Sequence, residues 1–199
     1  MGDRGAQRRE QLLLAALELF SERGYDRATT REIAESTGVT EAALFKYFPT
    51  KRDLFLEVLR RFGPAGHFAG AAERFGELPL TEALGAAIEQ HLDLWWEHRQ
   101  FGRILRQELE RDDEAREELR SQFRAMRADL RALIERLAER GEIRPDAVEA
   151  ASEVLLVALR GFIGRARRAG DESWESMRDD FNDSLVQVVV NGIAPVSSA

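Results

Sequence analysis

Residues 28–55, "ATTREIAESTGVTEAALFKYFPTKRDLF", carry closely spaced start and stop signals for short helices. Thr29 and Glu32 have the spacing of a capping box. In that motif the threonine oxygen accepts a hydrogen bond from a first-turn amide, and the glutamate bonds back to the amide of the threonine. Gly38 ends the helix after barely two turns. The spacing predicts one short helix followed by a tight turn.

Further helices are expected on both sides of this one. Thr40 is suited to cap a second short helix, which Pro49 ends, and Thr50 is suited to cap a third. Upstream, residues 8–23 carry apolar side chains at steps of three and four, and Gly24 stops that helix as a C-terminal glycine does. One long helix, two short helices joined by a glycine-containing turn and a closing helix together predict a helix-turn-helix inside a small bundle.

The second short helix has two chemically different faces. At about 100° per residue, Leu44 and Phe48 lie on one face. Ala42 and Lys46 lie about 160° and 200° away from Leu44, on the opposite face. Small side chains at Ala42 and Ala43 let such a helix enter a DNA groove, and a lysine reaches a phosphate or a guanine edge. This face therefore predicts DNA contact.

Lys46 and Lys51 are the only lysines of the chain. Lys51 follows Thr50 in the first turn of the third helix, where unpaired amides and the positive end of the helix dipole favour an anion. Either both lysines are solvated surface charges, or both contact DNA. Their shared position on one helix-turn-helix favours DNA contact.

Residues 13–58 resemble the N-terminal signature of the TetR/AcrR family of bacterial one-component repressors. The resemblance lies in Phe20, Gly24 and Tyr25, in the pattern T-R-E-I-A-x-x-x-G-V, in the pattern L-F-x-Y-F and in Lys51. The family implies an all-α fold in which an N-terminal helix-turn-helix domain binds DNA and a C-terminal helical domain binds a ligand and dimerises.

Ten residues are predicted to contact DNA, nine by this resemblance and Ala42 from its face of the helix. They are Thr30, Arg31, Thr40, Glu41, Ala42, Ala43, Phe45, Lys46, Tyr47 and Lys51. Phe45 stands where many relatives have tyrosine, so Tyr47 must supply any hydroxyl contact to a phosphate. Glu41 is open to two interpretations, because it can cap its helix or accept a hydrogen bond from a cytosine amino group.

The predicted division into a DNA-binding domain, residues 1–62, and an effector-binding and dimerisation domain, residues 63–199, also separates the charge. The net charge of the 199-residue chain is −7. The first part has 11 basic and 10 acidic residues, a net charge of +1, and the second has 18 and 26, a net charge of −8. Because a DNA-binding module needs only a local basic face, the acidic total does not exclude DNA as a partner.

Composition excludes several other classes of protein. The chain has no cysteine, and therefore no disulfide framework, thiolate nucleophile or cysteine-based zinc site. No apolar run approaches the roughly 18 residues of a membrane span, and the charged N-terminus lacks the uninterrupted apolar stretch that is typical of a signal peptide. A soluble, unexported, cytoplasmic protein is expected. Since no glycine loop cradles phosphate and no nucleophile-base pair is evident, neither an enzyme nor a cofactor is expected.

The sequence beyond residue 62 is helical in pattern. The segment 63–80, "GPAGHFAGAAERFGELPL", reads as a linker or irregular connection. Apolar residues at helical spacing return from Thr81 onward, and long helices are expected over roughly 113–140, 146–168 and 173–191.

A ligand pocket among the middle helices is predicted from aromatic and methionine side chains that can surround a flat or cationic guest. The predicted lining residues are His91, Trp95, Trp96, Phe101, Phe123 and Met126. The same stripe is equally consistent with a filled core. His91 and His98 lie seven residues apart on one face, but no third ligand follows at a useful spacing, so no metal is expected.

The two last helices are predicted to form a four-helix interface with a second copy, as the family does. The helix 146–168 is apolar on more than one face and holds Gly161 and Gly164. The predicted interface residues are Leu155, Leu159, Phe162, Ile163, Phe181, Leu185 and Val188. The alternative is that both helices only close the core of one protomer.

The sequence therefore predicts a homodimeric, ligand-responsive transcriptional regulator. The expected mode of action is that of a repressor released from a near-palindromic operator by a small-molecule effector. The alternative is an architectural or nucleoid-type helix-turn-helix protein that binds DNA without a ligand, for which positive charge spread over the whole surface would be expected.

Overall fold

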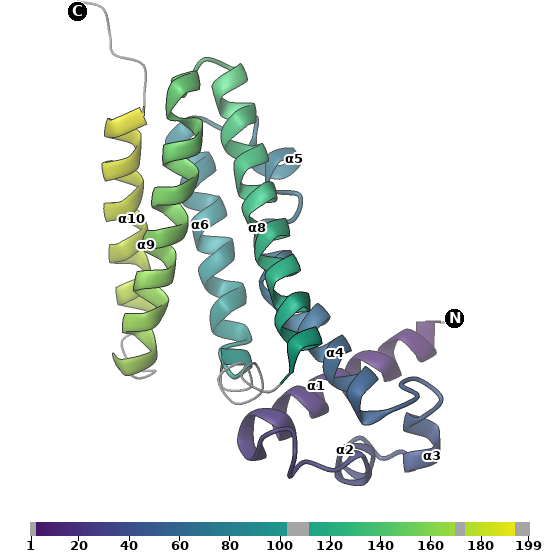
Figure 1. The fold of residues 1–199 in the computed structure, drawn as a ribbon. Helices are drawn as coiled ribbons and strands as arrows, with labels where there is room; N and C mark the ends of the chain where they lie inside the picture. Colours follow the sequence, from purple (N-terminus) through teal and green to yellow (C-terminus); the bar gives the residue numbers. More distant parts are fainter. Residues whose placement is uncertain (1–2, 103–111, 170–173, 194–199) are drawn as a thin grey trace, which may run out of the picture. The chain divides into compact units, whose positions relative to one another are not determined.

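The computed structural model describes residues 3–102, 112–169 and 174–193, and within these ranges the chain forms helices and no strand (Figure 1). The elements are α1 (Asp3–Arg23), α2 (Thr30–Ser36), α3 (Glu41–Leu44), α4 (Lys51–Phe62), η1 (Pro64–His67), α5 (Ala71–Phe75), α6 (Leu80–Glu97), α8 (Asp113–Glu139), η2 (Pro145–Ala147), α9 (Val148–Ala169) and α10 (Trp174–Ile193). The all-α prediction is confirmed.

The chain folds into two compact units. The first unit comprises Met1–Gly66 and Glu97–Phe123, and the second comprises His67–Trp96 and Arg124–Ala199. This division differs from the boundary expected after residue 62, because a segment more than 30 residues downstream packs with the N-terminal helices. Sequence order alone gives no sign of such a long-range contact.

The first unit has a core of its own, built from α1, α2, α3, α4 and the beginning of α8. Phe20 and Leu44 are fully buried in it, as are Leu54 and Leu59. From the downstream segment it also takes Phe101, Ala115 and Leu119. The rings of Phe20, Tyr25 and Phe55 meet at centroid distances of 4.9–5.8 Å. This packing holds the helix-turn-helix on the longer helices.

Side-chain caps define the short helices of the first unit. Thr29 and Glu32 form the predicted capping box, with the Thr29 side chain accepting from the amide of Glu32 and the Glu32 carboxylate accepting from the amide of Thr29. Thr40 and Thr50 cap α3 and α4 as predicted. Between α2 and α3, Gly38 takes a left-handed φ of 69°, which a residue with a side chain adopts only under strain.

The segment 63–80 is more regular than predicted. It forms η1 and α5 and contributes the buried residues Phe68 and Ala71 to the second unit. Its glycines suggested an irregular connection, but Gly70, with φ 66°, instead stands at the N-cap of α5.

The second unit is a layer of long helices. Figure 1 shows α6, α9, α10 and the C-terminal part of α8 running side by side. Leu84 and Ile88 from α6, Leu133 from α8 and Leu155 from α9 are at most 1% exposed in the shared core. None of the helices in the described ranges has the length and apolar character needed to cross a membrane.

Candidate nucleic-acid interface

The two faces predicted for the second short helix are present, although α3 ends at Leu44 and the chain continues towards Phe48 as a turn, so the helix is shorter than the predicted one that Pro49 ends. Leu44 is fully buried and Phe48 is 1% exposed, whereas Ala42 and Lys46 are exposed. Phe45, which directly follows α3, is 39% exposed. The outer face thus combines a methyl group, an aromatic ring and an ammonium group, which is a surface suited to a DNA groove.

Lys51 is held in place by its neighbours. Its ammonium lies 4.4 Å from the centroid of the Tyr25 ring and 3.4 Å from the backbone oxygen of Asp26. Both contacts come from the turn after α1, so the lysine at the N-terminus of α4 has a fixed position. Tyr25 therefore positions Lys51. The spacing of the two residues in the sequence does not predict this contact.

Thr30 and Glu41 bond to each other across the helix-turn-helix. Thr30 is 9% exposed, and its hydroxyl donates to Oε1 of Glu41 at 2.5 Å. The Thr30 hydroxyl is therefore committed inside the protein and does not face solvent, as a direct DNA contact would require. Glu41 does not cap α3 with its side chain, because Thr40 accepts the bond from the amide of Ala43.

The remaining predicted DNA contacts lie at or near the same surface. Arg31 is exposed and donates to Glu35 at 2.8 Å, and this hydrogen bond raises the pKa of Arg31. Thr40 is exposed, while Ala43 and Tyr47 are half-buried, with Tyr47 packed against the core of the first unit.

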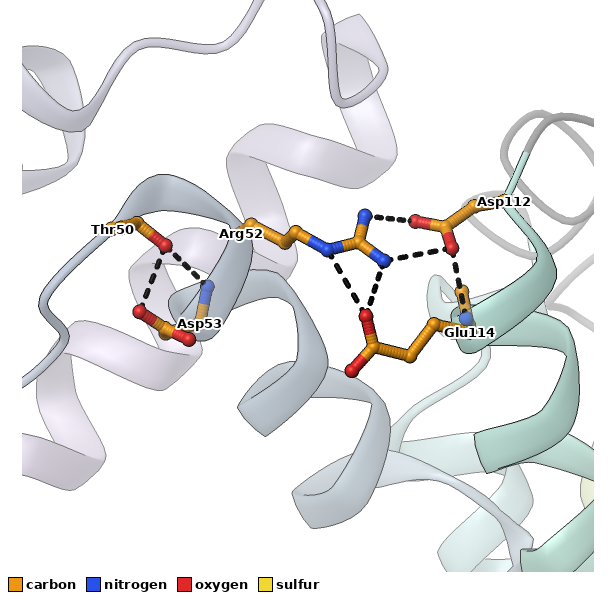
Figure 2. Close-up of polar contacts among 6 residues, drawn as sticks. Thr50, Arg52, Asp53, Asp112 and Glu114 are labelled. Carbon is orange, nitrogen blue, oxygen red and sulfur yellow. Dashed lines mark hydrogen bonds and ion pairs between the residues drawn. The ribbon is translucent and has the colours of Figure 1, made fainter.

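Arg52 joins α4 to the beginning of α8 (Figure 2). Its guanidinium points between two carboxylates, bonding both oxygens of Asp112 and, at 2.6 and 3.2 Å, one oxygen of Glu114. Asp112 also accepts from the amide of Ala115 at 3.0 Å. The hydrogen bonds from Arg52 hold the pKa of Asp112 below its ordinary value and raise that of Arg52. About 60 residues separate the partners, so sequence reasoning missed this contact.

Two further contacts continue the same junction along α4. Arg60 pairs with Glu118 at 3.1 Å, and the buried side-chain amide of Gln122 donates to the backbone oxygen of Leu59 at 2.8 Å. A Cβ atom on Gly63 would lie 1.9 Å from Oε1 of Gln122. The first three turns of α8 are therefore packed as part of the first unit.

The six residues predicted to line the pocket are divided between the two units. His91, Trp95, Trp96 and Met126 belong to the second unit. Phe101 instead lies in the core of the first unit, and Phe123 is 47% exposed. The helical stripe in the sequence does not reveal where the two cores separate. Trp174, absent from the prediction, stacks on Trp96 at 4.4 Å.

His91 has a partner that the sequence did not suggest. Its Nδ1 atom lies 3.1 Å from Nδ1 of His67, and the ring of Phe68 stacks on it at 5.0 Å. Burial, reinforced by His67, holds the pKa of His91 well below its ordinary value. His98 is in the other unit, beside Phe62. Within the described ranges, no three histidine, aspartate or glutamate side chains gather as metal ligands.

The predicted dimer residues mostly face the core of a single protomer. Leu155, Leu159, Phe162 and Leu185 are at most 8% exposed, and Ile163 and Phe181 pack partly buried against them. Of the seven, Val188 alone is strongly exposed, at 69%. The outward apolar residues of α9 are instead Val154 and Val157, at 52% and 69%. The prediction selected the inner stripe because both faces of α9 are apolar.

Comparison with known proteins agrees with this geometry. Residues 12–58 match the family of bacterial regulatory proteins of the tetR type, and residues 77–189 match a tetracyclin repressor-like C-terminal domain. The HTH-type transcriptional repressor AcnR of Corynebacterium efficiens is 28% identical over 165 residues, which span 82% of this chain and 84% of that protein.

Two other known proteins are similar to this chain, one in the sequence of the DNA-binding region and one in the fold. The HTH-type transcriptional activator FasR of Mycolicibacterium smegmatis is 47% identical over 55 residues, 28% of this chain and 25% of that protein. The crystal structure of a transcriptional regulator from Aquifex aeolicus has the same fold, with a TM-score of 0.73 at 18% identity over 91% of this chain and 99% of that one. Because the C-terminal match alone spans more than half of the residues, the chain belongs to the tetR family and is a DNA-binding transcriptional regulator, not an enzyme.

Proposed function

We propose that the protein is a dimeric, cytoplasmic repressor that binds a near-palindromic operator through α3 and is released by a small-molecule effector. The observation that carries this proposal is the outer face of α3, which we define as the exposed surface of α3 and of the turn that follows it. Ala42 and Lys46 are exposed there, next to the buried Leu44. AcnR, similar over most of both chains, is a repressor.

The proposed contacts divide between bases and phosphates. The α3 face enters the major groove, where Ala42 and Ala43 allow close approach and Lys46 bonds to a guanine edge or a phosphate. Lys51, held by Tyr25 at the N-terminus of α4, neutralises a phosphate. Arg31, with its exposed guanidinium, adds a second positive charge beside the same groove.

The proposed dimer interface is the outer face of α9 and α10. Val154 and Val157 on α9 and Val188 on α10 are 52–69% exposed, and contact with a second copy would bury them. Gly161 has open space beside its Cα, which allows close approach of a partner helix. Twofold symmetry then places two recognition helices about 35 Å apart, one for each half-site.

The effector is proposed to bind in the second unit, near His91. The Nε2 atom of His91 is buried and has no hydrogen-bond partner among the described residues. A buried polar atom without a partner is unfavourable by about 1–3 kcal/mol, so a ligand group that bonds to it is stabilising. Trp95 and Trp96, one helical turn further along α6, supply apolar surface for the rest of the ligand.

The proposed coupling between effector and DNA runs through α8. Its first turns are tied to α4 by Arg52, Arg60 and Gln122, and the rest of the helix belongs to the second unit. An effector that shifts α8 would therefore move α4 and change the half-site separation. Such coupling requires the effector to bind the DNA-incompetent arrangement more tightly than the competent one.

The test is selection of bound sequences from a random DNA pool by the purified protein, followed by a salt titration on the winning sequence. We expect an inverted repeat with two half-sites about one helical turn apart. Weak, salt-sensitive binding without enrichment would instead support the architectural alternative, because counterion release alone gives affinity without sequence preference.

A further inference from the structure

We propose that Glu41 determines operator specificity by accepting a hydrogen bond from the amino group of a cytosine in each half-site. The inference rests on the proposed function, because it concerns the same helix-turn-helix. It assigns a role to the one acidic side chain between residues 36 and 52. Glu41 is the first residue of α3, and the N-terminal residues of a recognition helix are those that reach base edges.

The Glu41 carboxylate is fixed by a buried partner. Thr30 is 9% exposed and donates its hydroxyl to Oε1 of Glu41 at 2.5 Å. This bond uses one lone pair of the carboxylate and leaves Oε2 available as an acceptor. Glu41 itself is half-buried, so its carboxylate is held at the edge of the protein surface.

Helix capping does not explain the carboxylate. The capping bond of α3 is made by Thr40, whose side chain accepts from the amide of Ala43 at 3.2 Å. Arg31 lies near enough to feel the charge of Glu41, but its hydrogen bond goes to Glu35. Glu41 is thus bonded to Thr30 and keeps acceptor capacity at Oε2, and it directly precedes the exposed Ala42 in the chain.

The negative charge of the Glu41 carboxylate determines which base it can contact. A carboxylate near the phosphate backbone is repelled unless it accepts a hydrogen bond, and in the major groove only the amino groups of cytosine and adenine donate. The adenine amino group lies between two acceptors, its own N7 and O4 of the paired thymine, and both repel a carboxylate. The cytosine amino group has an acceptor on one side only, O6 of the paired guanine. Guanine and thymine present acceptors at the corresponding place. A fixed carboxylate therefore favours cytosine.

The test compares sequence selection by the full chain and by Glu41→Gln, Thr30→Val and Glu35→Gln. For the wild-type protein we expect one cytosine position per half-site, at which other bases lower affinity about 5- to 140-fold. Glu41→Gln should lose that preference or shift it towards adenine, because glutamine bonds to both N6 and N7. Thr30→Val should weaken the cytosine preference, because it removes the hydroxyl that donates to Glu41. Thr30→Ser keeps a hydroxyl and should therefore keep the preference.

Glu35→Gln is the matched control, because it removes the same charge from an exposed position on α2, where Glu35 pairs with Arg31. It should keep the cytosine preference. The inference is overturned if Glu41→Gln, shown to be folded by circular dichroism, keeps the same base preference and changes affinity uniformly across sequences. If the wild-type protein selects no inverted repeat, the proposed function itself fails, which is a different result.

Discussion

In the first unit the DNA-binding helices are held by caps and side-chain contacts within the protein, whereas the second unit leaves apolar residues exposed on α9 and α10. In the first unit the caps of α2, α3 and α4 are satisfied and the cation of Lys51 is held against Tyr25. In the second, Val157 and Val188 are each 69% exposed, and Nε2 of His91 is buried without a partner among the described residues. This difference supports a preorganised DNA-binding surface in the first unit, and it supports the proposal that the second unit binds a second copy and an effector.

Breaking the apolar outer face of α9 should have the largest effect. Val157→Asp places a charge on the proposed interface and should split the dimer, because burying an unpaired carboxylate is strongly unfavourable. Operator affinity should fall more than about 100-fold, since one half-site contact is lost. Sedimentation and gel-shift titration would check both. Val157→Thr, of similar shape, should remain dimeric. A dimeric Val157→Asp with unchanged melting temperature would place the interface elsewhere.

A pair of glycine substitutions sharpens the contrast in packing between the units. A Cβ on Gly63 would lie 1.9 Å from Oε1 of Gln122 and 2.5 Å from the backbone oxygen of Leu59, so Gly63→Ala should destabilise the first unit by about 1–3 kcal/mol. Gly85, inside α6, has open space around it, and Gly85→Ala should be stabilising by about 0.5–1 kcal/mol. Urea denaturation compares the two variants. Equal effects would show that the α4–α8 junction is loosely packed.

The buried histidines of the second unit predict a pH dependence. Because burial lowers the pKa of His91 in the folded protein, the unfolded chain binds more protons below its ordinary pKa of about 6.5. Stability should therefore be constant above about pH 7.5 and fall as pH decreases through 6.5, by at most about 1.4 kcal/mol per pH unit for His91. Denaturation at pH 8.0, 7.0, 6.0 and 5.5 measures this, and His91→Phe should flatten the curve. Stability that rises on acidification would contradict a neutral, buried His91.

Removal of the Arg52 junction should have a smaller effect on stability. Arg52→Gln breaks a three-residue ion-pair network whose arginine is 43% exposed, so the loss should be about 1 kcal/mol and smaller at high salt. Arg31→Gln removes a more exposed pair within one helix and should change stability by less than about 0.5 kcal/mol. Thermal denaturation of both variants at two salt concentrations measures the two losses of stability and their salt dependence. If both variants melt alike, Arg52 does not bind α8 firmly to α4.

The same contrast explains how much the sequence alone could predict. The capping box of Thr29 and Glu32, the caps at Thr40 and Thr50 and the buried face of Leu44 depend on residues a few positions apart, so spacing is sufficient. The contacts of Arg52 with Asp112 and of His67 with His91 join residues 60 and 24 positions apart. Periodicity shows that such residues lie on helices, but it does not show which helices meet.

The predicted face of α9 differs from its exposed apolar face for a related reason. Leu155 and Val157 are both apolar and only two residues apart, yet the first is fully buried and the second is 69% exposed. A helix with apolar residues on both sides has no polar face to orient it. Only packing against the other helices distinguishes its core side from its outer side.

The central claim is that the outer face of α3 binds the operator, and the salt dependence of operator affinity tests it most directly. It should be measured for the wild-type protein and for Lys46→Ala on the sequence selected from the random pool. We predict weaker binding for Lys46→Ala. The salt slope should be shallower by about one if Lys46 meets a phosphate, and preference at one position should be lost if it meets a guanine. Unchanged affinity, slope and sequence preference would contradict the claim.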